Sequence, residues 1–567
     1  MRNFLSQISV FLDKQDKKAF FIYILALIFS GLITIVGIGT VIPLVVVLID
    51  PEKVARYLPV GFGVKNTVSV CVFLMIFAFI VKNVVAFALM CIQSKFQTQL
   101  SAKIRNKLFR NYLRSPMIFH KNNSSLTMIN NVSYQVQNLT NSVILPFGVL
   151  ITESLVSGIM LLVLLFIKPW LVIVLAISFV IIIGGLMSIV RVKSKRYEHL
   201  RADNLSGLNL IANNALGSIK ETKLYNQEDS FISRFENLSI QLQHMETLFL
   251  NIQQSSRFII ETVAVVIMLL LIYFLILLNQ SGFELLLILA VFSLLSSQLL
   301  PSLNRLMMAI SRIQISLPLL KKVHAAYIEV QDVTLSPDPT ANSSAINFAR
   351  EIELKDISFN YGQQNILKSV SLTIPKGVKV ALVGGSGAGK STLIDVLMCL
   401  LPSASGQIMV DNVPITSENI QAYQKLFAYV PQSIYLYDSS ILRNVACYDS
   451  PSEIDENQVW SALRFAGLED FVRNSPQGLD THVGQNGQRL SGGQQRRIGI
   501  ARAIYLNPSV LVMDEPTNGL DALVEAQIMR ELLSKDITVL LITHKIEILL
   551  NFAIVYNLEF GKLKIQS

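Results

Sequence analysis

The stretch GGSGAGKS at Gly384–Ser391 decides how the second half of the chain folds. It follows the apolar run Val378–Val383 and precedes Thr392–Leu400, a run with the composition of a helix. Strand, GxxxxGK[ST] and helix, in this order, form a nucleotide-phosphate loop. Glycines let successive backbone N–H groups approach phosphates, while Lys390 reaches the terminal phosphates and the Ser391 hydroxyl binds Mg²⁺. The strand and the helix disfavour the alternative, a glycine-rich turn that binds nothing.

The phosphate loop predicts ATP and Mg²⁺ as ligands. The following helix presents its positive N-terminal end to the same phosphates. The residues expected to contact the nucleotide here are Gly384, Gly385, Ser386, Gly387, Ala388, Gly389, Lys390, Ser391 and Thr392.

A second apolar run, Val510–Met513, ends in two acidic residues. In a nucleotide-binding domain, the strand-end Asp514 helps to hold Mg²⁺, and Glu515 accepts a proton from the water that attacks the γ-phosphate. An ordinary buried strand followed by acidic turn residues is the alternative. The phosphate loop in the same chain favours the catalytic interpretation.

The composition indicates a membrane protein. Of the 567 residues, 52% are hydrophobic and only 15% are charged, and the mean hydropathy is +0.50. The net charge of +9 is compatible with nucleic-acid binding or with cytoplasmic loops beside anionic lipid. The positions of the charges therefore have to decide between the two.

Six runs in the first half are long and apolar enough to cross a bilayer as helices. They cover approximately residues 20–49, 68–92, 143–167, 171–190, 258–278 and 284–311. The connections 93–142 and 191–257 are long, polar and rich in basic residues, whereas 50–66 is short. The positive-inside rule places both long loops and the N-terminus in the cytoplasm. Six spans then return the chain to the cytoplasm before the phosphate loop, and the basic charge requires no nucleic acid as a partner.

The fold class follows from this division. We expect a membrane α-helical domain over residues 1–330, with six transmembrane helices and long cytoplasmic extensions. A turn-rich linker over 331–350 precedes an α/β P-loop NTPase domain over 351–567.

A third motif identifies the kind of nucleotide-binding domain. LSGGQ at Leu490–Gln494 precedes the helix-forming run Gln495–Ala503, so small residues again lie ahead of a helix and form a site for an anion. This string resembles the signature sequence of ATP-binding cassette (ABC) proteins. The resemblance implies that Ser491, Gly492, Gly493 and Gln494 contact ATP and that the fold is that of a type I exporter. Phosphate loop, signature and Val510–Glu515 follow the family's order and spacing.

Further positions match the family one by one. Tyr361 resembles the aromatic residue that stacks on adenine. Gln432 resembles the glutamine that contacts Mg²⁺ and senses the transmembrane domain. His544 resembles the switch histidine at the γ-phosphate, and Asn518–Asp521 resembles the loop that crosses the dimer interface. The resemblance thus implies Glu515, His544 and Gln432 as catalytic residues, and Ser391, Gln432 and Asp514 as the metal ligands. Each of the three, Tyr361, Gln432 and His544, taken alone is also compatible with a packing or capping role.

The family resemblance also implies a dimer. In ABC proteins the signature of one subunit closes over ATP held by the phosphate loop of the other. One chain carries one of each and six spans, which is half of a transporter, so we expect a homodimer with two composite ATP sites. We expect it in the bacterial inner (cytoplasmic) membrane, as a multi-pass protein with its nucleotide-binding domain in the cytoplasm.

Charges within the spans bear on the substrate, because charge in hydrocarbon is unfavourable and usually faces a cavity. Lys82, Arg257 and Arg305 are each flanked by apolar residues. They predict a basic cavity for a phosphate or pyrophosphate head group. Snorkelling, or pairing with Glu153 or Glu261, is the alternative. Strings around these residues resemble the lipid-linked oligosaccharide flippases of the PglK group.

The sequence therefore predicts an ATP-driven exporter or flippase of an amphipathic, anionic, lipid-linked saccharide, with membrane lipid as its surroundings. Two alternatives stay open. One is export of a drug-like molecule, another lipid or a peptide. The other is a non-transporting ATPase whose membrane part serves only as an anchor.

Overall fold

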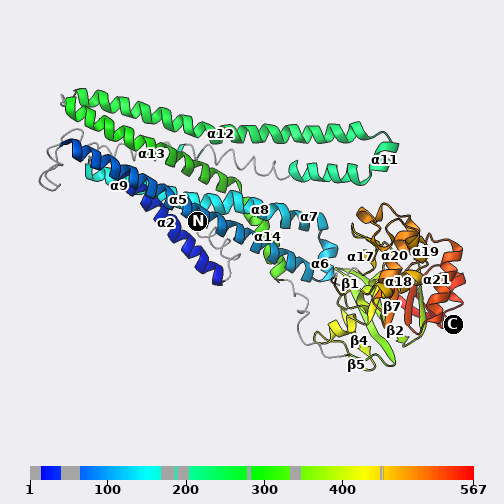
Figure 1. The fold of residues 1–567 in the computed structure, drawn as a ribbon. Helices are drawn as coiled ribbons and strands as arrows, with labels where there is room; N and C mark the ends of the chain where they lie inside the picture. The colour runs from blue at the N-terminus through cyan, green and yellow to red at the C-terminus, as the bar shows by residue number, and fades with distance from the viewer. Residues whose placement is uncertain are drawn as a thin grey trace. The chain divides into compact units, whose positions relative to one another are not determined.

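The computed structural model describes residues 14–39, 64–167, 184–185, 188, 204–277, 282–332, 346–446, 450 and 452–566. The chain divides into two compact units, which are described separately (Figure 1). The helical unit comprises Met1–Ser115 and Asn123–Thr334. The α/β unit comprises Pro116–Asn122 and Leu335–Ser567.

The described part of the helical unit consists of helices, several of them long (Figure 1). Residues 204–217 are also helical. The bounded helices are α2 (Lys14–Gly39), α5 (Val64–Arg114), α7 (Ser125–Asn130), η1 (Asn131–Gln135), α8 (Val136–Leu139), η2 (Thr140–Ile144), α9 (Leu145–Ile167), α11 (Ile219–Leu224), α12 (Glu228–Leu277), α13 (Gly282–Ile315) and α14 (Leu317–Asp332).

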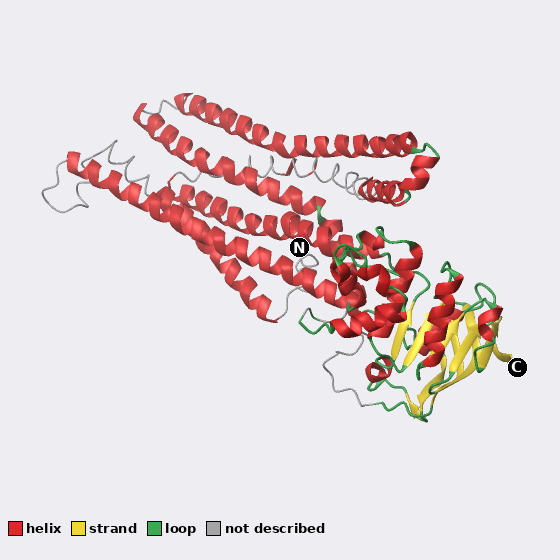
Figure 2. Cartoon of the chain, turned by 45° about the vertical axis from the view of Figure 1, so that its right-hand side comes forward, coloured by secondary structure: helices red, strands yellow, loops and turns green. Residues whose placement is uncertain are grey.

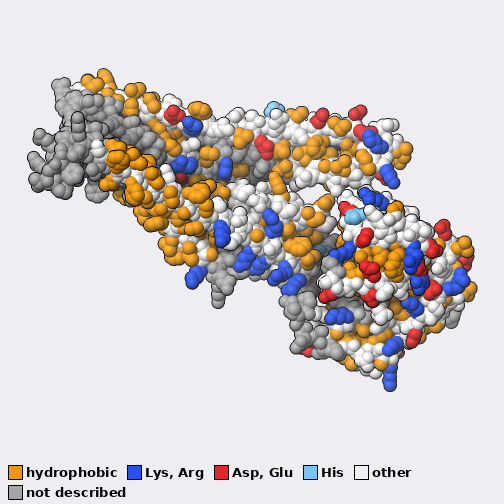
Figure 3. All heavy atoms as spheres, viewed as in Figure 1, with side chains coloured by type: hydrophobic (Ala, Val, Ile, Leu, Met, Phe, Trp, Pro, Cys, Tyr) orange, Lys and Arg blue, Asp and Glu red, His pale blue; other side chains and the backbone are white. Residues whose placement is uncertain are grey.

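Three helical stretches within the described residues are long and apolar enough to cross a membrane: Val72–Arg114, Ser125–Leu162 and Arg257–Phe274. Large side chains of α5, such as Phe73 and Phe77, are about 70% exposed, and hydrophobic side chains cover much of this unit's surface (Figure 3). Lipid tails are the solvent that such a surface prefers.

The predicted long extensions of the membrane helices are confirmed. The helix α5 has 51 residues and α12 has 50, more than twice the approximately 20 residues that a bilayer core requires. Most of the predicted span 171–190, the end of the first span over 40–49 and most of the connection 50–66 lie outside the described residues.

The α/β unit contains two sheets (Figure 2). One has four strands in the order β2-β1-β4-β5, with antiparallel pairing. The other has six strands in the order β10-β9-β3-β8-β7-β6, and only β10 runs antiparallel to its neighbour. The strands are β1 (Glu351–Tyr361), β2 (Gln364–Pro375), β3 (Lys379–Val383), β4 (Ser405–Val410), β5 (Val413–Pro414), β6 (Phe427–Val430), β7 (Val510–Asp514), β8 (Thr538–Ile542), β9 (Ile554–Glu559) and β10 (Lys562–Gln566).

Helices and short 3₁₀ turns surround these sheets (Figure 2). They are α6 (Met117–Asn122), α15 (Lys390–Leu397), α16 (Ile420–Gln424), α17 (Ile441–Val445), α18 (Glu456–Phe465), α19 (Glu469–Arg473), η3 (Gly478–Asp480), η4 (Gln485–Gly487), α20 (Gly492–Tyr505), α21 (Ala522–Ser534) and α22 (Ile546–Leu549).

The central strands of the larger sheet are apolar throughout because both of their faces are covered. Every residue of β7 and of β8 is buried. Near-continuous apolar runs are the pattern of parallel strands between helices. The sheet therefore forms a rigid base from which the polar residues that follow each strand project.

The short helix α6 packs within the α/β unit, although its sequence lies between two helices of the helical unit. Ile118 packs against the apolar core that includes Ile352 and Leu393, and Phe119 is buried. Ile118 thus attaches the segment Pro116–Asn122 to the unit that carries the phosphate loop.

Candidate functional site

Four neighbouring parallel strands bring the predicted site residues to one edge of the larger sheet. β3 leads into the phosphate loop, β7 ends at Asp514, β8 is followed by His544, and β6 is followed by Gln432. The carboxyl ends of parallel strands lie at the same edge, where open α/β sheets bind ligands. Segments that are far apart in sequence thus form one site.

The backbone of the phosphate loop has a shape that requires glycine. Gly384, Gly387 and Gly389 all have positive φ angles, of 149°, 76° and 102°. A Cβ atom at Gly384 would collide with the carbonyl oxygen of Leu558 in β9, so no larger residue fits there. The loop therefore packs against the sheet on one side, whereas Gly385 has open space around it.

Lys390 begins α15 and folds back over the loop. Its Nζ donates hydrogen bonds to the carbonyl oxygens of Gly384 and Gly385, at 2.8 and 3.0 Å. Burial lowers the pKa of Lys390, although the nearby charges of Glu515 and Asp514 oppose this effect. An ammonium group held in this position, with only carbonyls as hydrogen-bond acceptors, fits a site for the phosphates of a nucleotide.

Ser391 and Asp514, two of the three predicted metal ligands, are adjacent. The Ser391 hydroxyl donates a hydrogen bond to Asp514 Oδ2 at 3.2 Å. Burial raises the pKa of Asp514, the charges of Glu515 and Asp395 raise it further, and Ser391 and Lys390 oppose the shift. Excess negative charge in a buried site fits a divalent cation, which would favour the ionised carboxylate.

Within the described residues, no group of three His, Cys, Asp or Glu side chains is arranged to hold a metal ion. Mg²⁺ usually keeps several waters and binds through one or two protein oxygens together with substrate phosphates. The pair Ser391 and Asp514 suits this manner of binding.

Glu515 is the centre of the polar network. Its Oε2 accepts hydrogen bonds from Gln432 Nε2 at 2.9 Å and from Asn518 Nδ2 at 2.7 Å, and its Oε1 lies 3.1 Å from His544 Nε2. Glu515 also has a φ of 50°, a conformation that glutamate rarely adopts. Strain of this kind collects at functional sites. The predicted catalytic residues His544 and Gln432 thus both contact the third, Glu515.

The signature forms the first turn of α20. Ser491 is the N-cap, its Oγ accepts a hydrogen bond from the backbone N–H of Gln494, and Gln494 Oε1 accepts one from the Ser491 N–H. This capping box leaves the proton of the Ser491 hydroxyl available to an acceptor such as phosphate. Ser491 and Gly492 are exposed. The turn can therefore meet an anion from outside the chain.

Tyr361 ends β1 and is partly exposed. Its ring contacts Phe359 edge-on, with 4.8 Å between ring centroids. An aromatic ring at the surface of the α/β unit is suited to stacking on a base, as predicted.

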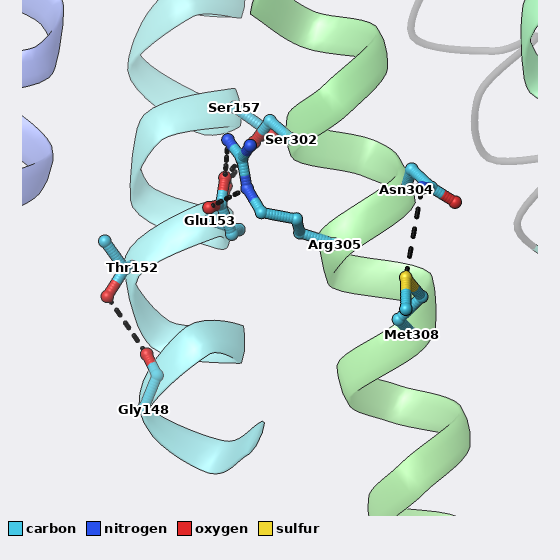
Figure 4. A network of polar contacts seen from close by, with 8 residues as sticks. All are labelled: Gly148, Thr152, Glu153, Ser157, Ser302, Asn304, Arg305 and Met308. Carbon is cyan, nitrogen blue, oxygen red and sulfur yellow. Dashed lines mark hydrogen bonds and ion pairs between the residues drawn. The ribbon is translucent and has the colours of Figure 1, made fainter. Parts of the chain in front are cut away.

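The three basic residues predicted for a substrate cavity have different surroundings. Arg305 on α13 pairs with Glu153 on α9, and Arg305 Nε lies 2.5 Å from Glu153 Oε1 (Figure 4). Ser302 Oγ donates to Glu153 Oε2 at 2.5 Å and lies 3.0 Å from Ser157 Oγ. Lys82 lies 5.1 Å from the centre of the Phe79 ring, and Arg257 is exposed. The pairing considered as the alternative thus applies to Arg305.

Two site residues were not singled out from the sequence. Asn518 was noticed only as part of a loop, yet its amide holds Glu515. Asp395 on α15 contributes to the charge around Asp514. Sequence signals for both exist: Asn518 follows Glu515 by three residues within a turn, and Asp395 follows Lys390 by five residues in the same short helix.

Comparison with known families supports the division of the chain. The family described as the ABC transporter transmembrane region matches residues 20–303, and the family described as ABC transporter matches residues 367–518. Together these matches include the long helices, the phosphate loop, the signature and Glu515.

Several characterised proteins are similar over most of the chain. The ATP-dependent lipid A-core flippase of Ralstonia nicotianae is 28% identical over 502 residues, which cover 85% of this chain and 82% of the relative. The flippase of the same name from Saccharophagus degradans is 27% identical and covers 81% and 77%. A solved structure of a bacterial Atm1-family ABC exporter with ATP bound has a TM-score of 0.74 at 20% identity, and covers 96% of this chain and 95% of its own.

Proposed function

The chain belongs to the ABC transporter family, and on this premise we propose that it is a homodimeric flippase for an anionic, lipid-linked saccharide in the bacterial inner membrane. Its ATPase activity is coupled to the movement of a substrate across the membrane. The observation that carries the substrate class is the similarity to lipid A-core flippases, which extends over more than three quarters of both partners in each comparison. Such lipids combine an apolar anchor with a charged, sugar-bearing head.

The site geometry indicates how hydrolysis proceeds. The phosphate-loop amides and Lys390 hold the β- and γ-phosphates, and Ser391, Asp514 and Gln432 would hold Mg²⁺, which neutralises developing charge on the phosphates. Glu515 would accept the proton of the attacking water, and His544, 3.1 Å from Glu515, would contact the γ-phosphate. Gln432 and Asn518 orient the Glu515 carboxylate by donating to Oε2.

Because Gln432 bonds to Glu515, it links the catalytic base to the loop that follows β6. If Gln432 also binds Mg²⁺, it would couple the position of the base to the presence of the metal and the nucleotide. This supports a cycle in which ATP favours a closed dimer and hydrolysis removes that bias.

The head group would meet Lys82 and Arg257, which the structure does not pair with a carboxylate among the described residues. Arg305 keeps about half of its side chain exposed, but Glu153 balances its charge. Lys82 and Arg257 therefore contribute most of the positive charge that an anionic head group needs.

The proposal is tested with proteoliposomes that contain the full chain and a fluorescent pyrophosphate-linked glycolipid. We expect flipping only with ATP and Mg²⁺, and its loss in Glu515→Gln, because that amide cannot take a proton. Lys82→Gln with Arg257→Gln should reduce flipping of the glycolipid at least about tenfold, as expected for two lost charged contacts, while basal ATPase is retained. Lys425→Gln, at an exposed site of the α/β unit, is the control.

Flipping that continues without ATP would refute the proposal. If the variant with Lys82→Gln and Arg257→Gln still exports a neutral drug-like molecule or a peptide, that molecule is the substrate and the glycolipid is not. ATPase activity without any transported molecule would point to an anchored ATPase.

A further inference from the structure

Lys121, in the short helix α6, contacts two residues of the nucleotide-binding region at once. Its Nζ lies 2.8 Å from the hydroxyl of Tyr361 and 2.7 Å from Asp395 Oδ2. All three residues belong to the α/β unit. Tyr361 is the aromatic residue expected to stack on the base, and Asp395 lies on α15, which begins with Lys390.

Lys121 does not cover a face of the Tyr361 ring. Lys121 Nζ lies 5.5 Å from the centre of the ring and bonds to the hydroxyl oxygen at its tip. These two distances place the ammonium beyond the tip, nearly in line with the C–O bond, and not against a face. Lys121 can therefore fix the orientation of the ring while a base lies on it.

The contact between Lys121 and Asp395 is partly buried. Side chains of Lys121 and Asp395 are 32% and 15% exposed, so both are partly withdrawn from water. Burial lowers the pKa of Lys121, but the hydrogen bonds to Asp395 and Tyr361 outweigh burial and raise it. The lysine remains charged at every physiological pH. Ile118 of the same helix packs against the core of the unit.

We propose that Lys121 is a positioning residue for the nucleotide: it holds the Tyr361 ring at the base end of the site and Asp395 on the phosphate-loop helix. Binding of ATP and docking of Pro116–Asn122 are then thermodynamically linked. A nucleotide that orders Tyr361 and α15 strengthens the attachment of α6, and by reciprocity the attached α6 strengthens nucleotide binding. The inference needs only nucleotide binding and holds whatever molecule the protein transports.

The first experiment measures the dissociation constant of ATP by equilibrium dialysis with the detergent-solubilised full chain, in Glu515→Gln so that ATP is not consumed. Lys121→Met keeps the length of the side chain and removes its charge. We expect it to raise the dissociation constant about five- to tenfold, a coupling at the lower end of the usual range. Lys425→Met, an exposed lysine on the same unit, should leave the constant unchanged.

A double-mutant cycle assigns the effect to the Tyr361 hydroxyl. Tyr361→Phe keeps the stacking ring and removes the hydroxyl that Lys121 contacts. If Lys121 acts through this hydroxyl, Lys121→Met changes the dissociation constant of ATP much less in the Tyr361→Phe background than in the protein that retains Tyr361. Asp395→Asn should weaken binding in the same direction. An unchanged dissociation constant in Lys121→Met, or full additivity with Tyr361→Phe, would overturn the proposal.

The second experiment needs no Lys121 variant and therefore covers the case in which one fails to fold. Hydrogen–deuterium exchange of the peptide that contains residues 116–122 is compared with and without ATP in the Glu515→Gln protein. We expect ATP to slow this exchange several-fold, and Tyr361→Phe to reduce the protection. If ATP protects the phosphate loop but not residues 116–122, the linkage does not exist.

Discussion

At the scale of single residues, the site concentrates negative charge around Asp514. Asp514 is buried, with its pKa raised by burial and by the charges of Glu515 and Asp395. Glu515 adds backbone strain, with a φ of 50°. Both features destabilise the folded protein. They are explained by a role in binding the nucleotide phosphates and Mg²⁺.

Asp514→Asn should therefore stabilise the nucleotide-free protein while it abolishes ATPase activity. The amide keeps the shape of the side chain and can accept from Ser391, but it carries no charge to be buried. We expect the melting temperature of the purified protein without nucleotide to rise by roughly 2–4 °C, the shift that about 1 kcal/mol produces in a domain of this size. Differential scanning fluorimetry measures it.

The stabilisation should depend on pH with a defined sign. The folded-state pKa of Asp514 lies above its ordinary value of 3.8, so the folded protein takes up this proton at a higher pH than the unfolded chain. Wild-type Asp514 is thus destabilising at neutral pH and less so as pH falls through its folded pKa. The difference in melting temperature between wild type and Asp514→Asn should shrink as the pH falls through the folded-state pKa of Asp514. A difference that grows on acidification would contradict the raised pKa.

At the scale of helices and strands, the sequence predicted the elements that carry the ATP site. Val510–Met513 is part of β7, and Val378–Val383 contains β3, because a run of apolar residues before a polar one is a local signal. The family motifs then fixed which polar residue follows each strand. The order of the strands and the contacts Gln432–Glu515 and Lys121–Tyr361 join segments far apart in the sequence and leave no local pattern.

The membrane helices show a further limit of sequence reasoning. Lys82, Arg257 and Arg305 have the same apolar flanks in the sequence, and only the packing of α9 on α13 distinguishes Arg305 through Glu153. Similarly, the long connection 93–142 was predicted to extend the membrane helices, but no local pattern specifies which side chains of the α/β unit Pro116–Asn122 contacts. Which residues contact each other across long sequence separations can be read only from the folded structure.

The Glu153–Arg305 pair joins α9 to α13. The losses of unfolding free energy on replacing its two residues should be strongly non-additive. Glu153→Leu or Arg305→Leu alone leaves one charge without its partner. Because about half of the Arg305 side chain is exposed, each should destabilise the protein by less than the roughly 3–5 kcal/mol expected for breaking a fully buried pair. Glu153→Leu with Arg305→Leu should be considerably more stable than the sum of the single changes predicts, as measured by thermal unfolding in lipid nanodiscs.

The same double variant separates a structural from a substrate-binding role of Arg305. If it folds and flips the glycolipid at the wild-type rate, Arg305 serves to join the helices. If it folds, retains basal ATPase and loses only flipping, Arg305 contacts the head group and Glu153 is a competitor for it. Lys425→Gln, at an exposed site of the α/β unit, is the control for loss of a charge alone.

At the scale of the whole molecule, one chain carries one phosphate loop and one signature, which suits an assembly of two. The signature residues Ser491 and Gly492 are exposed, and the Ser491 hydroxyl keeps a proton to donate. A homodimer with composite sites lets the signature of each protomer act on the nucleotide of the other. In this arrangement neither protomer contains a complete site.

Two substitutions distributed in different ways between two protomers test this arrangement. Lys390→Ala damages the phosphate loop. Gly492→Asp places a carboxylate where the signature would meet phosphate, and a Cβ at Gly492 has open space, so the fold tolerates it. Heterodimers are co-expressed with two affinity tags, purified in tandem and assayed for ATPase activity. Homodimers of either single variant should be nearly inactive, because each has both composite sites damaged.

The trans heterodimer pairs Lys390→Ala in one protomer with Gly492→Asp in the other. One of its composite sites carries both substitutions, and the other carries neither. We therefore expect about half of the wild-type ATPase rate if the two sites act independently. The cis heterodimer pairs a protomer carrying both substitutions with a wild-type protomer and has a lesion in each composite site, so it should be nearly inactive. Both heterodimers contain the same substitutions, and only their distribution differs. If every site lay within one chain, the result would be reversed: the cis form would be half active and the trans form inactive.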